Sequence, residues 1–170
     1  MEHIRSTIAV MLAALVCVAT MVVQIPSPMQ GYVNLGDCFV LLSGWLLGPW
    51  YGGAAAGIGS MLVDLLSGYG HYVPGTLIIK GVDALAAALI FRAMGRSKTA
   101  LLVSGTVGEI IMVAGYFFYA SLILGKGLAA AASIPGNIVQ GIAGVAIGMA
   151  LAMVLQKTKS SVIRGCNMQQ

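Results

Sequence analysis

The sequence predicts an all-α membrane protein with six transmembrane helices, and three observations support this fold class. Of its 170 residues, 59% are hydrophobic and only 8% are charged, and the mean hydropathy is +0.95. Ordinary soluble domains carry about 25% charged residues. Six apolar stretches recur along the chain, close to the roughly 20 residues that cross a bilayer as a helix. Short connections rich in Gly and Pro separate them, so we expect one integral membrane domain over residues 1–170 whose successive helices are neighbours.

The expected helices follow the apolar stretches in order. They span residues 6–25, 36–49, 52–67, 75–94, 100–124 and 134–155. Turn residues end the first four at Pro26-Ser27-Pro28, Gly48-Pro49, Gly68 to Gly75, and Gly95 to Lys98. The first stretch could instead be a secretory signal, but it is longer than a typical signal core. Ser27-Pro28 is also a poor cleavage site, which favours a helix that stays in the protein.

The positive charges predict the orientation, because Lys and Arg are retained on the cytoplasmic side. In a six-span arrangement one side carries Arg5, then Arg92, Arg96 and Lys98, then Lys157, Lys159 and Arg164. Lys126 lies in an opposite loop, and Lys80 lies inside a span. We therefore expect both termini in the cytoplasm and the chain in the plasma membrane of a prokaryote.

Polar residues inside the apolar stretches predict a binding site. Four of the five acidic residues, Asp37, Asp64, Asp83 and Glu109, lie in or at the edge of expected spans. A charge at the centre of a membrane helix costs at least about 2.5–3.5 kcal/mol and is by default a functional-site hypothesis.

Depth along the helices decides which polar residues can meet. At a rise of about 1.5 Å per residue, a set of them falls near the outer face: Asp37, Asp64, Lys80, Tyr116, Asn137 and Gln140 in helices, with Tyr69, His71 and Tyr72 in the loop after the third helix. Donors, acceptors and aromatic faces that converge in this way predict a pocket for a small polar or heteroaromatic molecule, open to the outside.

Each of these residues also has a structural interpretation. Lys80 and Asp83 are three apart on one helix face and could neutralise each other. Asp64 could cap a helix end or pair with Lys80, and His71 could be an ordinary loop residue. Asn137 and Gln140 could simply bond across helices. The residue types alone leave both interpretations open.

Catalytic arrangements are missing from the sequence. It contains no HExxH, GxSxG or P-loop pattern and no paired Cys/His metal motif. The cysteines Cys17, Cys38 and Cys166 form no CxxC pair. We therefore expect neither an enzyme nor a metal site, and no cofactor.

Small residues four apart predict close helix contacts. Gly53 and Gly57 in the third helix, and Gly144 and Gly148 in the sixth, form GxxxG pairs that let two backbones approach. Internal packing is the expected role of both glycine pairs. Ala9 and Ala13 form an AxxxA face on the first helix that could serve internal packing or a partner interface.

Five motifs in order resemble a known family. They are residues 31–37 (GYVNLGD), the Gly/Ala-rich run 48–59 that opens with Gly-Pro, 64–69 (DLLSGY), 74–81 (PGTLIIKG) and 135–140 (PGNIVQ). Together they resemble the substrate-binding S component of energy-coupling factor (ECF) vitamin transporters. The likeness covers roughly residues 6–155 and is nearest to the branch associated with hydroxymethylpyrimidine, pyridoxine and riboflavin-type substrates.

The resemblance implies a function. It implies the high-affinity substrate-capture subunit of an ATP-driven importer, with a vitamin site near the extracellular side. Its partners would be a transmembrane T component and two cytoplasmic ATPases that hydrolyse ATP, in agreement with the missing Walker A motif here. A pyridoxine- or hydroxymethylpyrimidine-like substrate is favoured, and riboflavin is also compatible.

The resemblance also implies roles for particular residues. Ala9 and Ala13 match an alanine-rich face that docks onto the T component. Residues 26–35 match a loop that closes over the substrate, with Asn34 as its expected contact. The loop between helices three and four would add contacts from Tyr69, His71 and Tyr72. After capture, the whole S component would topple in the membrane to present its site inward.

Two other functions compete with this one. A secondary transporter acting alone could use Lys80, Asp83 and Glu109 as an ion relay, but it usually has an internal repeat, and none is visible here. A structural membrane subunit would use the polar residues only for bonds between helices. The sequence does not identify the vitamin, because no motif in it indicates which substituents of a ring would be recognised.

Overall fold

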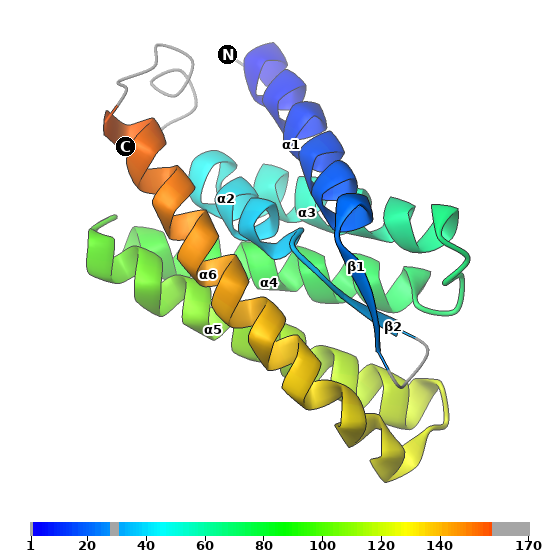
Figure 1. The fold of residues 1–170 in the computed structure, drawn as a ribbon. Coiled ribbons are helices and arrows are strands. Elements are labelled where there is room, and N and C mark those ends of the chain that lie inside the picture. Colours follow the sequence, from blue (N-terminus) through cyan, green and yellow to red (C-terminus); the bar gives the residue numbers. More distant parts are fainter. Residues whose placement is uncertain (1, 28–30, 158–170) are drawn as a thin grey trace.

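The computed structural model describes residues 2–27 and 31–157, and most of these residues are helical (Figure 1). The six long helices are α1 (Glu2–Val22), α2 (Asp37–Leu47), α3 (Pro49–Leu66), α4 (Val73–Ala93), α5 (Lys98–Phe118) and α6 (Ile134–Lys157). A π-helical turn, η1 (Tyr119–Ile123), extends α5, and a 3₁₀ segment, η2 (Gly127–Ser133), leads into α6. The predicted all-α class is confirmed, and each expected helix is present within a few residues of its expected bounds.

A short β-hairpin between α1 and α2 was not expected. Strands β1 (Gln24–Ser27) and β2 (Gly31–Asn34) pair antiparallel, with Gln24 opposite Asn34 and Pro26 opposite Tyr32. The first helix therefore ends at Val22, three residues before the predicted end. Pro26 has no backbone N–H and disfavours helical backbone at the residue before it, which explains why the apolar stretch does not continue as helix.

Fewer described segments are long and apolar enough to cross a membrane than there are long helices. In the described part of the chain, four segments are long and apolar enough to cross a membrane: Glu2–Val22, Val73–Ala93, Lys98–Ile123 and Gly127–Lys157. Helix α2 has only 11 residues, about 16 Å at 1.5 Å per residue, against a hydrocarbon core about 30 Å thick. Six crossings therefore remain a prediction.

Both described ends of the chain lie at the same end of the bundle, beside the connection between α4 and α5 (Figure 1). The hairpin, the α3–α4 connection and the η1–η2 segment lie at the opposite end (Figure 1). Arg5, Arg92 and Arg96 lie near enough to interact electrostatically at the end with the termini. This arrangement agrees with the predicted clustering of basic residues on one side, while its assignment to the cytoplasm stays a prediction. Lys159, Arg164 and Cys166 lie outside the described residues.

Glycines let the helices cross closely. A Cβ on Gly57 of α3 would lie 2.6 Å from the Leu77 carbonyl oxygen of α4, and one on Gly53 would lie 3.0 Å from the Gly81 carbonyl oxygen. A Cβ on Gly148 of α6 would lie 3.2 Å from the Cys38 carbonyl oxygen of α2. The GxxxG pairs therefore pack α3 on α4 and α6 on α2, as expected.

An apolar core fills the half of the bundle nearer the termini. Trp45, Leu41, Phe91 and Leu101 belong to one buried cluster there. The rings of Trp45 and Phe91 have centroids 6.3 Å apart, and the Trp45 indole N–H donates to the Ser104 hydroxyl over 2.9 Å. The buried charged side chains Asp37, Asp64, Lys80, Asp83 and Glu109 all lie outside this cluster.

Candidate ligand-binding site

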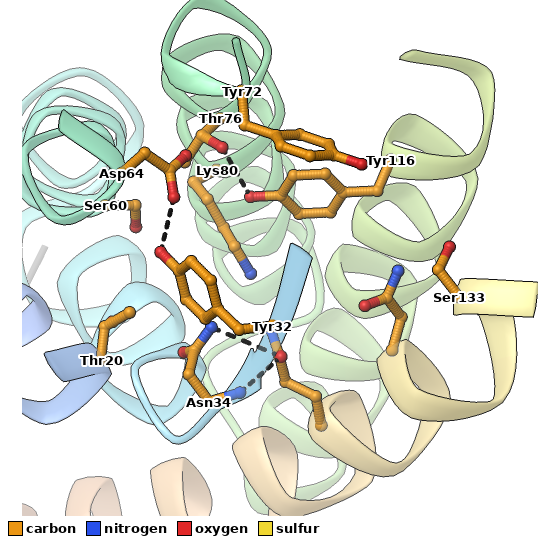
Figure 2. Close-up of a pocket in the computed structure, with 12 residues that line it drawn as sticks. Thr20, Tyr32, Asn34, Ser60, Asp64, Tyr72, Thr76, Lys80, Tyr116 and Ser133 are labelled. Carbon is orange, nitrogen blue, oxygen red and sulfur yellow. Dashed lines mark hydrogen bonds between the residues drawn. The ribbon is translucent and has the colours of Figure 1, made fainter. Parts of the chain in front are cut away.

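A polar cavity lies at the hairpin end of the bundle (Figure 2). It has about 50 Å³ of free space. Side chains from five of the long helices, β2, η2 and the α3–α4 connection line it: Thr20, Tyr32, Asn34, Ser60, Asp64, Tyr72, Thr76, Lys80, Tyr116, Ser133, Asn137 and Gln140. Every one of them carries a hydrogen-bonding group, although 59% of the chain is hydrophobic. Polar groups are concentrated here in the way a small-molecule site requires.

Most of the predicted site residues lie around this cavity. Seven of the ten line it: Asn34, Asp64, Tyr72, Lys80, Tyr116, Asn137 and Gln140. The other three, Asp37, Tyr69 and His71, do not line the cavity but contact residues that do. The structure thus brings the predicted residues together, and their contact with a substrate stays a prediction.

Five lining residues were not predicted: Thr20, Tyr32, Ser60, Thr76 and Ser133. Two of them could have been found from the sequence, because Ser60 precedes Asp64 by four residues and Thr76 precedes Lys80 by four. Residues four apart share a helix face. Thr20 and Ser133 have no such signal, because they come into place only through tertiary packing.

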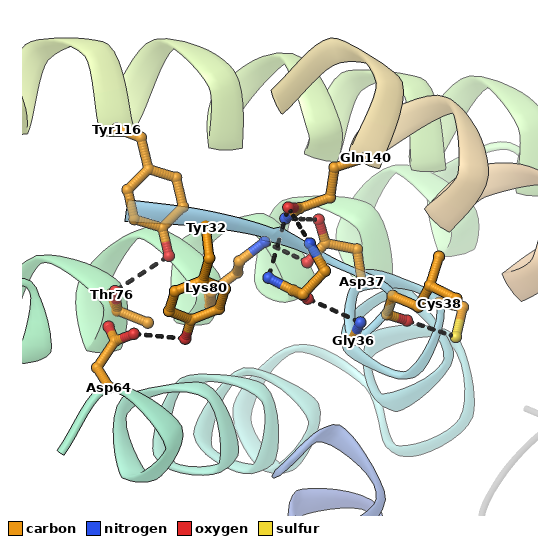
Figure 3. Close-up of polar contacts among 11 residues, drawn as sticks. Tyr32, Gly36, Asp37, Cys38, Asp64, Thr76, Lys80, Tyr116 and Gln140 are labelled. Atoms are coloured by element: carbon orange, nitrogen blue, oxygen red, sulfur yellow. Dashed lines mark hydrogen bonds and ion pairs between the residues drawn. The ribbon is translucent and has the colours of Figure 1, made fainter. Parts of the chain in front are cut away.

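Lys80 forms the floor of the cavity through a buried ion pair (Figure 3). Its ammonium donates to Oδ1 of Asp37, at the start of α2, and neither side chain is more than 3% exposed. The predicted alternative, a pair between Lys80 and Asp83, is therefore wrong. The long Lys80 side chain extends across to α2 instead of turning along its own helix.

Gln140 links this ion pair to the hairpin (Figure 3). Its amide N–H donates to Oδ2 of Asp37 over 2.7 Å, while its carbonyl oxygen accepts the Asn34 backbone N–H over 2.8 Å. The Asn34 side-chain oxygen in turn accepts the Gly36 backbone N–H over 2.8 Å. A continuous polar chain thus runs from α4 through α2 and α6 to β2.

Tyr32 projects from the hairpin into the cavity and reaches α3 (Figure 2). Its hydroxyl donates to Oδ1 of Asp64 over 2.5 Å, and its ring centroid lies 5.0 Å from that of Tyr69. Burial, and then the neighbouring Asp64 carboxylate, raise the pKa of Tyr32 above its ordinary range. Asp64 therefore holds the hairpin and does not form an ion pair with Lys80.

A cluster of aromatic rings forms one rim of the cavity around Tyr72. The ring centroid of Tyr72 lies 4.8 Å from that of His71, 6.2 Å from Tyr116 and 6.0 Å from Tyr119. The Lys126 ammonium lies 5.2 Å from the Tyr72 ring centroid. Such a rim offers flat faces against which a planar ring can stack.

The chemistry of these groups is that of recognition. The cavity combines amide donors and acceptors, hydroxyl groups, one ammonium and aromatic faces. Among residues 2–27 and 31–157, no cluster of three or more His, Cys, Asp or Glu side chains could hold a metal ion. The fold and these lining groups fit a membrane protein with a site for a small molecule.

Comparison with known proteins identifies the family. Residues 4–157 match the family described as the ECF-type riboflavin transporter, S component, and the chain belongs to this family. It is therefore a substrate-binding subunit of an ECF transporter and a multi-pass membrane protein, and this role in transport is not that of an enzyme.

Two individual proteins are similar to the chain. An uncharacterized protein from Pyrococcus woesei is 40% identical over 144 residues, which cover 84% of this chain and 95% of that protein. A solved structure described as the S component of a bacterial ECF transporter aligns with a TM-score of 0.71 and 21% sequence identity. The alignment covers 93% of this chain and 98% of that one, and at this identity it shows a shared fold.

Proposed function

We propose that this chain captures a planar heteroaromatic vitamin or vitamin precursor from outside the cell, with high affinity, for an ATP-driven ECF importer. The observation that carries the proposal is the cavity, which is lined entirely by side chains with polar groups in an otherwise apolar chain. The family supports the same function through its description as a riboflavin transporter component.

The lining groups indicate the kind of ligand. Tyr72 and Tyr116 offer aromatic faces, Asn137 and Gln140 can each donate and accept hydrogen bonds, and Lys80 donates. A ring with nitrogen acceptors and hydroxyl groups would use all of these contacts. Riboflavin, pyridoxine and hydroxymethylpyrimidine share this chemistry and differ mainly in size.

The hairpin would have to move before such a ligand could enter. The cavity has about 50 Å³ of free space, whereas pockets for drug-sized ligands measure about 300–1,000 Å³. Tyr32 lines the site, and opening would break its bond to Asp64 as well as the bond that the Gln24 side chain of β1 donates to Ser67 at the end of α3. A pyridine or pyrimidine ring requires a smaller opening than the three-ring system of riboflavin.

The partners in this proposal are a transmembrane T component and two cytoplasmic ATPases. Helix α1 would be the docking element, because it carries the alanine pair that matches the family's docking face. In the structure Ala9 and Ala13 are partly buried against the core, and a Cβ on Gly59 of α3 would lie 2.5 Å from the Ala13 carbonyl oxygen. This face therefore also packs internally, while Val10 and Val18 on the same helix are 70% and 57% exposed.

A binding titration tests the proposal. Purified protein in detergent is titrated with riboflavin, pyridoxine and hydroxymethylpyrimidine while tryptophan fluorescence is followed. One of them should bind at nanomolar concentration, and Asn137→Ala should weaken that binding about 10-fold to 100-fold because a ligand group loses its partner.

The control substitution is Val139→Ala, on the same helix but 64% exposed and outside the cavity. It should leave the affinity unchanged. An equal loss in both variants, or no binding across a wider vitamin panel, would contradict the proposal and favour an ion-coupled or structural role.

A further inference from the structure

Four ionisable side chains form a buried layer at and beneath the cavity floor. They are Asp37 on α2, Lys80 and Asp83 on α4, and Glu109 on α5, and none is more than 5% exposed. Lys80 and Asp37 form the ion pair that faces the cavity. Asp83 and Glu109 have no part in the cavity described above, so their burial requires another explanation.

Glycines show how closely the carboxyl groups are packed. A Cβ on Gly144 of α6 would lie 2.8 Å from both the Asp37 Cβ and the Glu109 Oε1. A Cβ on Gly108 of α5 would lie 2.3 Å from Oδ1 of Asp83. The helices thus leave room for these carboxyl groups at positions where any larger residue would displace them.

Asp37 differs from Asp83 and Glu109 in its hydrogen-bond partners. Asp37 receives donors from Lys80 and Gln140. In the described part of the chain, none of the four carboxyl oxygens of Asp83 and Glu109 has a hydrogen-bond partner. Glu109 lies close to Asp37, because the position of a Cβ on Gly144 is 2.8 Å from both Oε1 of Glu109 and Cβ of Asp37. Two ionised carboxylates in such contact would repel each other with no donor between them.

Within residues 2–27 and 31–157, no further positive charge compensates these acids. The other ionisable groups around the layer are Asp64 on α3, Tyr116 on α5 and Cys38 on α2, and none of them is a cation. Helix α6 has no acidic or basic side chain before Lys157. One ammonium therefore faces three carboxyl groups, and isolated buried charges are strongly disfavoured.

We propose that Asp83 and Glu109 each bind a proton at neutral pH, which makes this layer a two-proton site with no net charge. The positive charge of Lys80 and the negative charge of Asp37 then balance. Given the function proposed above, a cavity floor with no net charge fits an uncharged vitamin such as riboflavin and disfavours a cationic one such as thiamine.

Infrared spectroscopy of the purified, ligand-free protein tests the proton site, because a protonated carboxyl group has a C=O band distinct from that of a carboxylate. Wild-type protein at neutral pH should show this band. Asp83→Asn and Glu109→Gln should each remove one component, and the double variant should remove both. Glu2→Gln, which removes an exposed carboxyl group at the start of α1, is the control and should leave both components in place.

Isotope labelling gives a second readout that needs no variant. Carbon-13 in the carboxyl groups of aspartate should shift one component in wild-type protein, and the same label in glutamate should shift the other. Absence of a protonated-carboxyl band, or a band that neither label shifts, would overturn the proposal.

Titration with riboflavin and thiamine tests the consequence for the ligand. The protein is expected to bind riboflavin and not thiamine. Thiamine binding of equal or greater affinity would contradict a cavity floor with no net charge. The infrared result needs no ligand. A protonated-carboxyl band in a protein that binds no vitamin would therefore support the proton site while contradicting the proposed transport function.

Discussion

The Lys80 ammonium is buried, and the Asp37 carboxylate is its ion-pair partner. Removing one partner of a buried pair leaves the other charge uncompensated, whereas replacing both can be nearly neutral. The spacing within the sequence indicated Asp83 as the partner, because side chains three apart on a helix are neighbours. The actual partner is 43 positions away, and only the packing of α2 against α4 brings it close.

Lys80→Met should lower the free energy of unfolding by about 3–5 kcal/mol, because Asp37 would remain buried without its cation. The double variant Lys80→Met with Asp37→Asn should recover most of this loss. Thermal unfolding of the detergent-solubilised variants measures both effects. Equal destabilisation in the single and the double variant would contradict the ion pair as described.

Tyr32 should stay protonated at alkaline pH. Burial and the nearby Asp64 carboxylate raise its pKa in the folded protein, whereas an exposed tyrosine ionises near pH 10. The protonated Tyr32 hydroxyl therefore contributes its full stabilisation of the closed hairpin below about pH 10. That contribution to the free energy of unfolding is lost as the pH rises above this value. Ultraviolet absorbance of tyrosinate should rise equally in wild type and Tyr32→Phe around pH 10. One extra tyrosinate in the wild type would refute the buried hydrogen bond.

At the scale of the elements, helix crossings depend on glycines that allow backbones to touch. A Cβ on Gly44 of α2 would lie 2.3 Å from the Ala84 carbonyl oxygen of α4. Backbone cannot move aside as a flexible side chain can, so this crossing holds α2, and with it Asp37, against α4. A Cβ on Gly81 of α4 meets its nearest atom, the Gly53 carbonyl oxygen, only at 3.5 Å.

Gly44→Ala should therefore destabilise the protein by about 1–3 kcal/mol through overpacking. Gly81→Ala is the matched control and should be nearly neutral, because its methyl group fits and alanine favours helix. The midpoint of thermal unfolding distinguishes the two variants. A similar shift for both would show that the α2–α4 crossing is less tight than described.

How well each element could be predicted depends on the kind of signal it carries. The long helices follow from runs of apolar residues, and the cavity follows from the depth at which Asp64, Lys80 and Asn137 occur along them. The β-hairpin could not be predicted in the same way, because strands of four residues that include Pro26 carry little pattern. Tyr32 was missed for this reason, since its role depends on the hairpin.

At the scale of the whole molecule, the arrangement separates a polar end from a basic end. The hairpin and the α3–α4 connection lie at one end, and the described termini lie at the other (Figure 1). The cavity belongs to the first end, because Tyr32 and Asn34 of the hairpin line it. Lys and Arg mark the cytoplasmic side of membrane proteins. The whole arrangement therefore predicts that the cavity faces outward and both termini face the cytoplasm.

Cysteine labelling in intact cells tests this orientation. In a background with Cys17, Cys38 and Cys166 replaced by serine, Gly70→Cys in the α3–α4 connection should react with a membrane-impermeant maleimide. Met94→Cys at the end of α4 should react only after the cells are opened. The reverse pattern would invert the proposed orientation.

The central claim is that this chain is the vitamin-binding subunit of an ECF importer, and small molecules released from the purified protein test it most directly. The protein is purified in detergent without added vitamin, denatured, and analysed by mass spectrometry beside a Lys80→Met, Asp37→Asn double variant. We expect a near-stoichiometric heteroaromatic vitamin from the wild type and much less from the variant. No vitamin in either sample, together with no binding from an added vitamin panel, would contradict the account.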